Sequence, residues 1–219
     1  MIMDGNGRWA KRRGMPRRAG HGAGSETFRT IATFCKDIGL DHLTVYALST
    51  ENRANRPVDE LEGIFNLLRK YLKESLASME KDRVKMKFIG DISPMPEDIQ
   101  DLIAKTEEVS AGYEGCQVNI CLNYGGRDEL VRAARKLSGT PSEEITQESF
   151  ANALDTAKIP DPDICIRTGG ESRTSNFLPW QLAYAELYFT KTLWPDFSPK
   201  ELTAILTDFS KRNRRYGGL

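Results

Sequence analysis

The stretch from Met3 to Gly24 constrains this chain more than any other part of it. It reads MDGNGRWAKRRGMPRRAGHGAG, in which a short apolar segment leads into an aspartate, two glycines and a run of basic residues. This order predicts that a strand ends, the backbone turns on glycines and a helix begins. Free N–H groups at a helix start, arginines and one carboxylate together suit a diphosphate with a divalent metal. A solvated basic turn is the plainer interpretation.

The same stretch also fits a dinucleotide-binding fingerprint, because Gly5 to Ala10 match G-x-G-x-x-A. The apolar segment before it is short for a strand, and the acid about twenty residues later, Glu26, falls inside a helical pattern. The fingerprint also leaves Asp4 and the arginines without a role. We therefore rank it below the diphosphate site.

Charge and cysteine content narrow the class of protein. Lys and Arg number 31 and Asp and Glu number 31, so no overall field favours nucleic acid. The four scattered cysteines predict reduced, mostly buried thiols of a cytoplasmic protein, and two histidines argue against a histidine-based metal centre. No apolar run approaches twenty residues, so we expect peripheral membrane contact at most. The length of 219 residues predicts a single domain over 1–219.

Apolar periodicity predicts an α/β fold, with helices that flank a mainly parallel sheet of about six strands. The expected helices are 25–38, 58–81, 96–109, 129–137, 147–154 and 199–212. The expected strands are the short first segment, 43–48, 84–89, 118–122, 164–166 and 185–189. Lysines alternate with apolar residues in 84–89, which places that strand near an edge. The long helix 58–81 has an apolar face that suits either a core or the wall of a hydrophobic tunnel.

Polar residues follow several predicted strands, where a parallel sheet brings side chains to a ligand. After 43–48 come Ser49, Thr50, Glu51 and Asn52, for which a helix-capping loop is an equal alternative. After 164–166, Arg167 and Arg173 flank a Gly-Gly turn, with Ser175 beside them. Because one arginine side chain can donate to two phosphate oxygens at once, this loop predicts a second anion site.

Glu186 interrupts the last apolar strand. A carboxylate in a strand core is costly unless it is paired or holds a metal. Glu186 is therefore a candidate functional residue, with a salt bridge to an arginine as the alternative.

Taken together, these motifs resemble the cis-prenyltransferase family. The matching strings are MDGNGRWA, GHGAG, YALSTEN, NYGGRDEL, IRTGGESRTSNFLPWQLAYAELYF and LWPDF, and the match runs from Met3 to Gly218. The resemblance implies a parallel-sheet α/β fold, a homodimer and the repeated cis-addition of isopentenyl diphosphate to an allylic diphosphate such as farnesyl diphosphate, assisted by Mg²⁺. It implies undecaprenyl diphosphate, the precursor of a cell-wall carrier lipid, as the product. A short- or medium-chain synthase is one alternative. A non-catalytic partner subunit is another, although it would be expected to lack Asp4 and Arg8.

The resemblance also implies roles for individual residues. Asp4 is the metal-associated and catalytic aspartate, and Asn52 takes part in proton removal. The implied allylic diphosphate site comprises Gly5, Asn6, Gly7, Arg8, Trp9, Arg17 and His21. Ser49 and Asn52 lie near the condensing carbons, Glu51 lies between them, and Thr50 is a further substrate-binding candidate. The implied isopentenyl diphosphate site comprises Arg167, Arg173 and Ser175, with Thr174 as a further candidate. Glu186 is the second metal-associated carboxylate, and Arg215 and Gly217 belong to a tail that reaches the partner subunit.

The chain departs from the family pattern in two places. Only Met1 and Ile2 precede Met3, so the first strand is expected to be truncated and Asp4 to be less firmly anchored. After the second strand the family pattern Glu-Asn-Trp-x-Arg-Pro becomes Glu51-Asn52-Arg53-Ala54-Asn55-Arg56-Pro57. The family's arginine then corresponds to Arg56, with Arg53 as the other substrate-binding candidate, and this loop is expected to be mobile.

Overall fold

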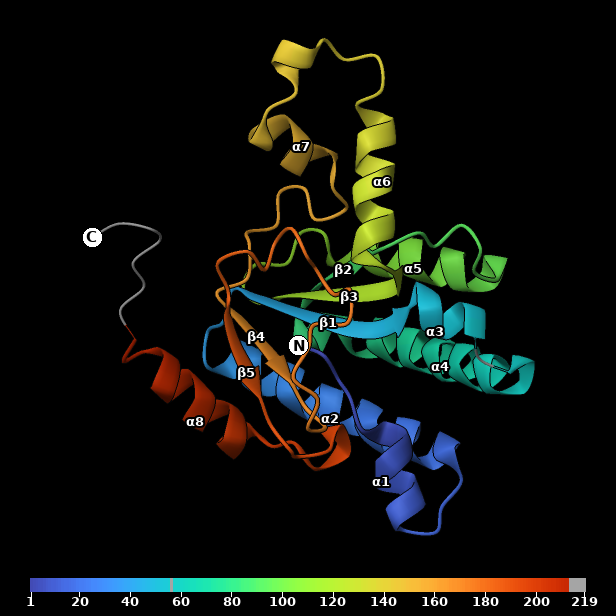
Figure 1. Ribbon diagram of the computed structural model, residues 1–219. Coiled ribbons are helices and arrows are strands. Elements are labelled where there is room, and N and C mark those ends of the chain that lie inside the picture. Colours follow the sequence, from blue (N-terminus) through green and yellow to red (C-terminus); the bar gives the residue numbers. More distant parts are fainter. Residues whose placement is uncertain (56, 213–219) are drawn as a thin grey trace.

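The computed structural model describes residues 1–55 and 57–212. In chain order the elements are α1 (Asn6–Arg12), α2 (Arg17–Asp37), β1 (His42–Ser49), α3 (Thr50–Asn55), α4 (Val58–Asp82), β2 (Lys85–Ile89), α5 (Glu97–Ser110), β3 (Gln117–Tyr124), α6 (Gly126–Lys136), η1 (Ser142–Glu144), α7 (Gln147–Ala153), β4 (Ile164–Arg167), β5 (Glu186–Phe189), η2 (Trp194–Asp196) and α8 (Pro199–Phe209). Figure 1 shows α6 and α7 at the top of the molecule and α1 at the bottom.

Two helices differ from the sequence prediction. Helix α2 begins at Arg17 instead of residue 25, although its first turns contain three glycines. Gly20 and Gly24 are buried there against Asn6, so packing outweighs the low helix propensity of glycine. The segment after β1, expected as a mobile loop, forms the short helix α3.

The sheet consists of two parallel parts. Strands β1, β3 and β2 lie in the order β1-β3-β2, so β2 is at an edge as predicted, and β4 pairs with β5. Ile2 joins the two parts through single parallel bridges to Tyr46 in β1 and Arg167 in β4. Its N–H donates to the carbonyl of Ile166 at 2.8 Å.

The prediction of about six strands is therefore wrong for the described residues, which form five strands and one bridging residue. The first segment makes only one bridge on each side because the chain turns into α1 at Asn6. Since Ile2 bridges both parts in parallel, the carboxyl ends of β1, β3 and β4 face the same edge.

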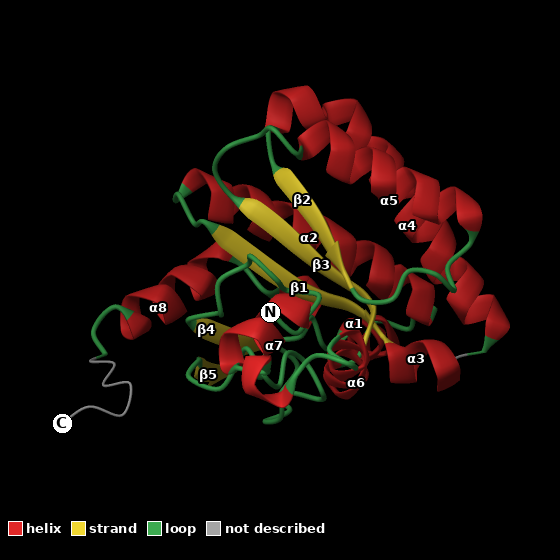
Figure 2. Cartoon of the chain, turned by 90° about the horizontal axis from the view of Figure 1, so that it is seen from above, coloured by secondary structure: helices red, strands yellow, loops and turns green. Residues whose placement is uncertain are grey.

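The main core lies between the sheet and its helices. Ile31 of α2, Ile99 and Ile103 of α5 and Val45 and Val118 of the strands are almost completely buried in one cluster. In Figure 2 the three strands lie side by side, with α4 and α5 along one flank and the β4–β5 pair on the other. A smaller aromatic cluster contains Tyr46 stacked on Phe177.

The prediction of reduced, buried cysteines is confirmed. Cys35, Cys116, Cys121 and Cys165 are free and buried. Burial raises the pKa of the Cys35 thiol to about 12, so this side chain is a small apolar core residue at neutral pH. The cysteines therefore serve packing and hold no metal-ligand geometry among the described residues.

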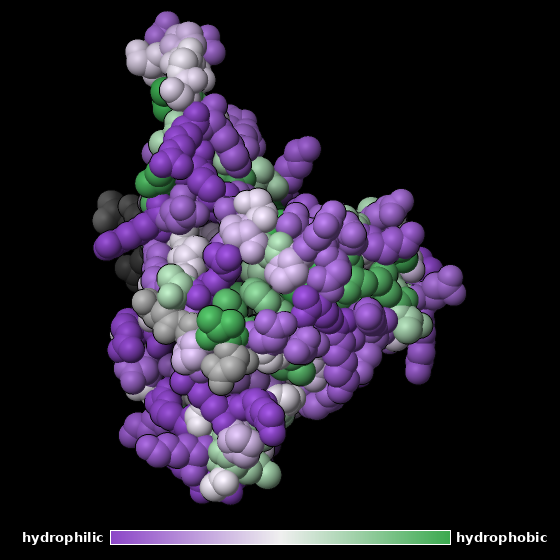
Figure 3. All heavy atoms as spheres, turned by 90° about the vertical axis from the view of Figure 1, so that its right-hand side faces the viewer, coloured by the Kyte–Doolittle hydropathy of each residue, from purple (hydrophilic) through white to green (hydrophobic). Residues whose placement is uncertain are grey.

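The visible surface is mostly hydrophilic. In Figure 3, apolar side chains show as green areas between charged ones, which are purple. Within residues 1–55 and 57–212, no helix combines the length and the apolar character that crossing a bilayer requires.

Candidate functional site

Asp4 lies at the centre of the candidate site, between two arginines from different parts of the chain. Its Oδ1 is 3.0 Å from Nη2 of Arg8, one turn into α1, and its Oδ2 is 3.0 Å from Nη2 of Arg167, at the end of β4. The Asp4 side chain keeps 29% of its surface exposed, so a ligand can reach it. The structure thus joins the two basic motifs that are far apart in sequence.

The backbone of Asp4 is firmly anchored, contrary to the expectation from its short preceding strand. Its N–H donates to Oγ1 of Thr168 at 3.1 Å, and its carbonyl accepts from the N–H of Trp194 at 2.9 Å. The Thr168 hydroxyl in turn donates to the Asp4 carbonyl at 2.7 Å. Gly5 follows with φ at 114°, and a Cβ there would lie 2.9 Å from the Leu193 side chain. Only glycine makes this turn without strain.

Arg167 organises the second basic loop. Its side chain is only 6% exposed, and Nη1 donates to the Arg173 carbonyl and to Oγ of Ser175, both at 2.6 Å. Its buried Nε has no hydrogen-bond partner among the described residues. A buried cation with an unused donor is a feature of an anion-binding site. The side chain of Arg173 is exposed and pairs with Glu171, and Thr174 lies in the same loop.

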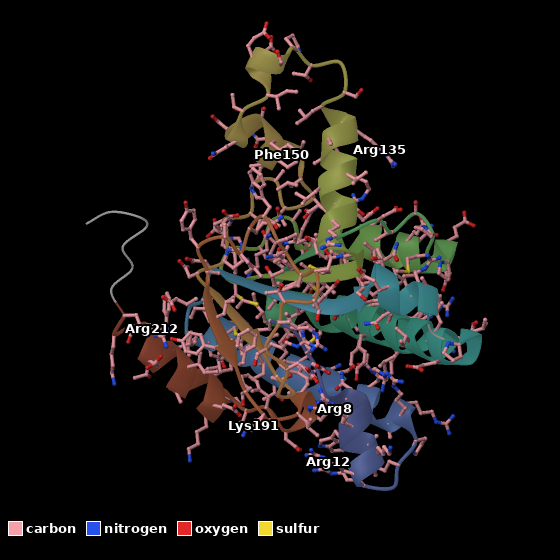
Figure 4. All side chains as sticks on the ribbon, viewed as in Figure 1. Arg8, Arg12, Arg135, Phe150, Lys191 and Arg212 are labelled. Carbon is pink, nitrogen blue, oxygen red and sulfur yellow. The ribbon has the colours of Figure 1, made fainter. Side chains whose placement is uncertain are left out.

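A polar pocket of about 580 Å³ opens beside Asp4. It is lined by Met3, Asp4, Gly5, Asn6, Gly7, Arg8, Lys11, Gly14, Met15, Arg17 and His21. Six of the seven residues expected to hold the allylic diphosphate therefore surround one space. Figure 4 shows Arg8 in the lower part of the molecule, with Arg12, on the same helix, a little further down.

The seventh residue, Trp9, does not line this pocket. Its indole Nε1 donates to Asp196 at 2.7 Å, and the Arg13 guanidinium lies 4.0 Å from the ring centre. The ring therefore packs α1 against η2.

Sequence reasoning did not single out Glu60 of α4. Its Oε1 is 3.4 Å from Nε of Arg17 and 3.9 Å from Nε2 of His21.

A second, largely apolar cavity of about 510 Å³ adjoins the polar pocket. Its walls include Phe28 of α2, Ala47 of β1, Leu68 and Leu72 of α4, and Phe88 and Ile120 of the strands. Met3, Asn6 and His21 line both spaces. A ligand with a charged head and an apolar tail could therefore lie across this boundary.

Helix α3 carries the polar residues that follow β1. The buried Ser49 hydroxyl accepts from the Asn52 N–H at 3.0 Å. Burial by itself would raise the pKa of Glu51. Hydrogen bonds from its own backbone, Asn176, Ser49 and Thr50 have a larger combined effect, and they lower the pKa of Glu51 below its usual range. Arg53 instead donates to the Pro94 carbonyl at 3.1 Å.

Glu186 lies away from Asp4 in this structure. It begins β5 opposite Ile164, at the other end of β4 from Arg167, and its Oε2 is 2.7 Å from Nη1 of Arg212. In Figure 4, Arg212 lies at the left of the molecule, near the end of α8, and Arg8 lies lower and to the right of it. The Glu186 side chain is 30% exposed because β5 is half exposed and not a core strand. The salt bridge to an arginine, which was the alternative for Glu186 in the sequence analysis, is thus present.

Arg56, Arg215 and Gly217, which are further predicted site residues, lie outside the described residues.

The residues around Asp4 suit a metal ion that is coordinated mainly by a bound phosphate and water, with few ligands from the protein. Among the described residues, no group of three or more His, Cys, Asp and Glu side chains could hold a metal. Asp4 offers one hard oxygen ligand at the edge of a basic pocket. Mg²⁺ commonly binds proteins through one or two carboxylates and takes phosphate and water oxygens for the rest.

Comparison with known proteins gives a consistent result over the whole chain. Residues 2–217 match a family model described as putative undecaprenyl diphosphate synthase. An isoprenyl transferase of Aquifex pyrophilus is 47% identical, with 99% of this chain and 94% of that protein covered. One of Treponema denticola is 45% identical, with 99% and 95% covered.

Two solved structures share the fold. Lavandulyl diphosphate synthase from Lavandula x intermedia, solved with dimethylallyl diphosphate, has a TM-score of 0.93 at 34% identity, with 99% of this chain and 95% of that chain covered. A probable undecaprenyl diphosphate synthase from Campylobacter jejuni has a TM-score of 0.80 at 34% identity, with 90% and 92% covered.

Proposed function

Because the chain belongs to the cis-prenyltransferase family of undecaprenyl diphosphate synthases, and is an enzyme of that type, we propose that it adds isopentenyl diphosphate repeatedly to farnesyl diphosphate. The proposed product is undecaprenyl diphosphate, made by a single domain in the cytoplasm for the cell-wall carrier lipid.

One observation carries this proposal: the basic pocket and the apolar cavity share Met3, Asn6 and His21. An allylic diphosphate has a multiply charged anionic head and an apolar tail, and it matches the two spaces in charge and polarity. We infer that the head occupies the basic pocket and the growing chain enters the apolar cavity, which would act as the hydrophobic tunnel.

The residues divide into two proposed anion sites. Arg8, Arg17 and His21 would bind the allylic diphosphate. Arg167, Arg173 and Ser175 would bind isopentenyl diphosphate, with the buried Nε of Arg167 as an available donor. Because Asp4 contacts both Arg8 and Arg167, it lies between the two diphosphates in this arrangement.

In the reaction, the carbon–oxygen bond to the allylic diphosphate breaks and the isopentenyl double bond forms the new carbon–carbon bond. The arginines would stabilise negative charge as it develops on the leaving group. Mg²⁺, held by Asp4 and phosphate oxygens, would neutralise further charge there. Asn52, whose N–H donates to Ser49, would lie near the carbon that loses the proton, and the released diphosphate would accept that proton. A metal role for Glu186 would require its ion pair with Arg212 to open.

A homodimer is part of the proposal. Tyr184, Leu187 and Phe189, on and beside β5, are 71%, 45% and 40% exposed. Such a cluster of apolar side chains suits burial against a second copy. We further propose that the tail with Arg215 and Gly217 reaches the partner's site. Sedimentation of the full chain tests the dimer, and Leu187→Glu is expected to yield monomers.

Product analysis tests the activity. The full chain is incubated with farnesyl diphosphate, labelled isopentenyl diphosphate and Mg²⁺, and the products are separated by length. We expect a ladder ending near eleven isoprene units, and a shorter end point would favour a short- or medium-chain synthase. Asp4→Asn should abolish the ladder, whereas Asp101→Asn, at an exposed position of α5, should leave it unchanged. An active Asp4→Asn enzyme would refute the role of Asp4.

A further inference from the structure

Asn176 makes three hydrogen bonds to two other segments of the chain. Its side-chain Nδ2 donates to Oε1 of Glu51 at 2.8 Å, and its Oδ1 accepts from the N–H of Arg127 at 2.9 Å. Its backbone carbonyl accepts from the N–H of Gly126 at 2.8 Å. A carboxylate requires a donor and an N–H requires an acceptor, so the two neighbours fix the orientation of the amide.

These bonds connect the segments that leave three strands. Glu51 lies on α3 after β1, Gly126 and Arg127 begin α6 after β3, and Asn176 belongs to the loop after β4. The three strand ends face the same edge of the sheet, where the candidate site lies. Asn176 is therefore the side chain that ties the Arg167 loop to both neighbouring segments.

The local backbone accounts for an asparagine here. Ser175 and Asn176 both have positive φ, at 49° and 64°. Asparagine tolerates this left-handed region better than most residues. The β3–α6 turn is also packed closely, because a Cβ on Gly126 would lie 2.9 Å from the Asn176 carbonyl. A small shift of Asn176 would therefore be transmitted to α6.

Asn176 and its partner Glu51 each adjoin a proposed substrate contact in the sequence. Ser175 precedes Asn176 and accepts from Arg167, while Glu51 adjoins Asn52, whose N–H is bound by Ser49. We propose that Asn176 is a positioning residue, which sets the isopentenyl diphosphate loop against α3 through its bond to Glu51. This inference rests on the proposed function of the two segments.

The test exchanges the hydrogen-bond donor and acceptor between Asn176 and Glu51. Asn176→Asp keeps the acceptor for the Arg127 N–H but places a carboxylate against Glu51. Glu51→Gln alone keeps a neutral hydrogen bond. In the double variant, the Gln amide can donate to the new carboxylate, so the contact is restored with the donor and acceptor exchanged.

We expect Asn176→Asp to lower kcat/KM for isopentenyl diphosphate about 30-fold in the wild-type background and less than about 3-fold in the Glu51→Gln background. The KM for farnesyl diphosphate should change less than about 2-fold. Asn66→Asp, on α4, is the control for an added charge. Equal losses in both backgrounds would overturn the proposal, as would an equal rise in both KM values.

The pH profile separates positioning from a general structural effect. Two adjacent carboxylates raise the pKa of one of them, and the protonated form can again donate a hydrogen bond. The activity of Asn176→Asp relative to wild type should therefore rise as the pH falls from 8 to 6, while the ratio for the double variant stays flat. A flat ratio for Asn176→Asp would contradict the inference.

If the wild-type chain makes no prenyl product, the proposed function fails but the inference is still tested. Calorimetry with inorganic diphosphate then measures the same coupling. Asn176→Asp should weaken binding and the double variant should restore it, with thermal midpoints unchanged within a few degrees. Equal binding by all variants would overturn the positioning role.

Discussion

The carboxylate of Asp4 and the buried guanidinium of Arg167 meet at 3.0 Å, although 163 positions separate them in the sequence. Arg167 also donates to a backbone carbonyl and a hydroxyl of its own loop. One cation therefore sets the spacing of both basic motifs, and changes at Arg167 should affect both proposed anion sites.

Arg167→Lys should lower kcat/KM for isopentenyl diphosphate at least about 100-fold, or about 2.7 kcal/mol. A lysine ammonium cannot reach three separated acceptors as the planar guanidinium does. Steady-state kinetics with both substrates measure the loss. Arg135→Lys, at an exposed position of α6, serves as the control and should match wild type. Wild-type kinetics for Arg167→Lys would show that the charge alone is sufficient.

Arg173→Ala should weaken the binding of isopentenyl diphosphate and leave the binding of the allylic substrate nearly unchanged. The Arg173 side chain is 63% exposed and paired with Glu171, so its removal should disturb the fold little. We expect the KM for isopentenyl diphosphate to rise about 10-fold, the effect of losing one charge-assisted hydrogen bond. The KM for the allylic substrate should change less than 2-fold. The reverse pattern would mean that the two sites are exchanged.

Two glycines of α2 give a matched pair of stability predictions. A Cβ on Gly20 would lie 2.0 Å from the backbone carbonyl of Asn6, whereas a Cβ on Gly22 would meet nothing within 4 Å. Gly20→Ala should therefore lower the free energy of unfolding by about 1–3 kcal/mol or more, because α1 must move. Gly22→Ala should raise it by about 0.5–1 kcal/mol. Urea denaturation compares them, and equal midpoints would contradict the close contact of α1 with α2.

Alkaline pH should destabilise the fold through its buried thiols. Burial raises the pKa of Cys35 to about 12, and it also raises the pKa values of Cys116, Cys121 and Cys165. A folded-state pKa above the unfolded value gives stability that is complete below the unfolded pKa and is lost as pH rises. The loss begins near pH 9 and reaches about 1.4 kcal/mol per pH unit for each thiol.

Urea midpoints at pH 7, 8, 9 and 10 measure this dependence. Cys35→Ala should reduce the slope above pH 9. An unchanged slope in that variant would show that Cys35 titrates alike in the folded and unfolded chain.

Ala47 should control product length if the apolar cavity holds the growing chain. It lies on β1 and faces that cavity with an exposed side chain. Ala47→Leu should shorten the longest product while the first addition proceeds at a wild-type rate within about 2-fold. Ala104→Leu, at an exposed position of α5, is the size-matched control. A full-length ladder from Ala47→Leu would place the chain elsewhere.

The sequence predicted those elements whose apolar pattern is strong and local. Helix α4, expected over 58–81, runs from Val58 to Asp82, and strand β3 is buried along almost its whole length. The early start of α2 was not predictable, because it depends on glycines that pack against Asn6. Helix α3 was missed because its six residues carry too little periodicity.

Site residues followed the same division. The glycine-rich and arginine-rich motifs predicted residues that the structure brings together around Asp4, whereas Thr168, Glu60 and Asn176 were not singled out. Each of these acts through a partner more than 35 positions away, such as Asp4 for Thr168 and Arg17 for Glu60. A single sequence has no signal for such pairs. Glu186 was expected inside a core strand, but its strand is half exposed and Arg212 neutralises its charge.

The bridge at Ile2 has a consequence for how the chain folds. The residue that joins the two parts of the sheet bridges Arg167 and donates to the Ile166 carbonyl, so the joint closes only after most of the chain has been synthesised. Long-range closures of this kind are slow, because loop entropy is lost before contacts compensate for it. The β1-β3-β2 part should therefore gain protection from hydrogen exchange before the β4–β5 part, with Asp4 placed last. The proposed active site would therefore form late in folding.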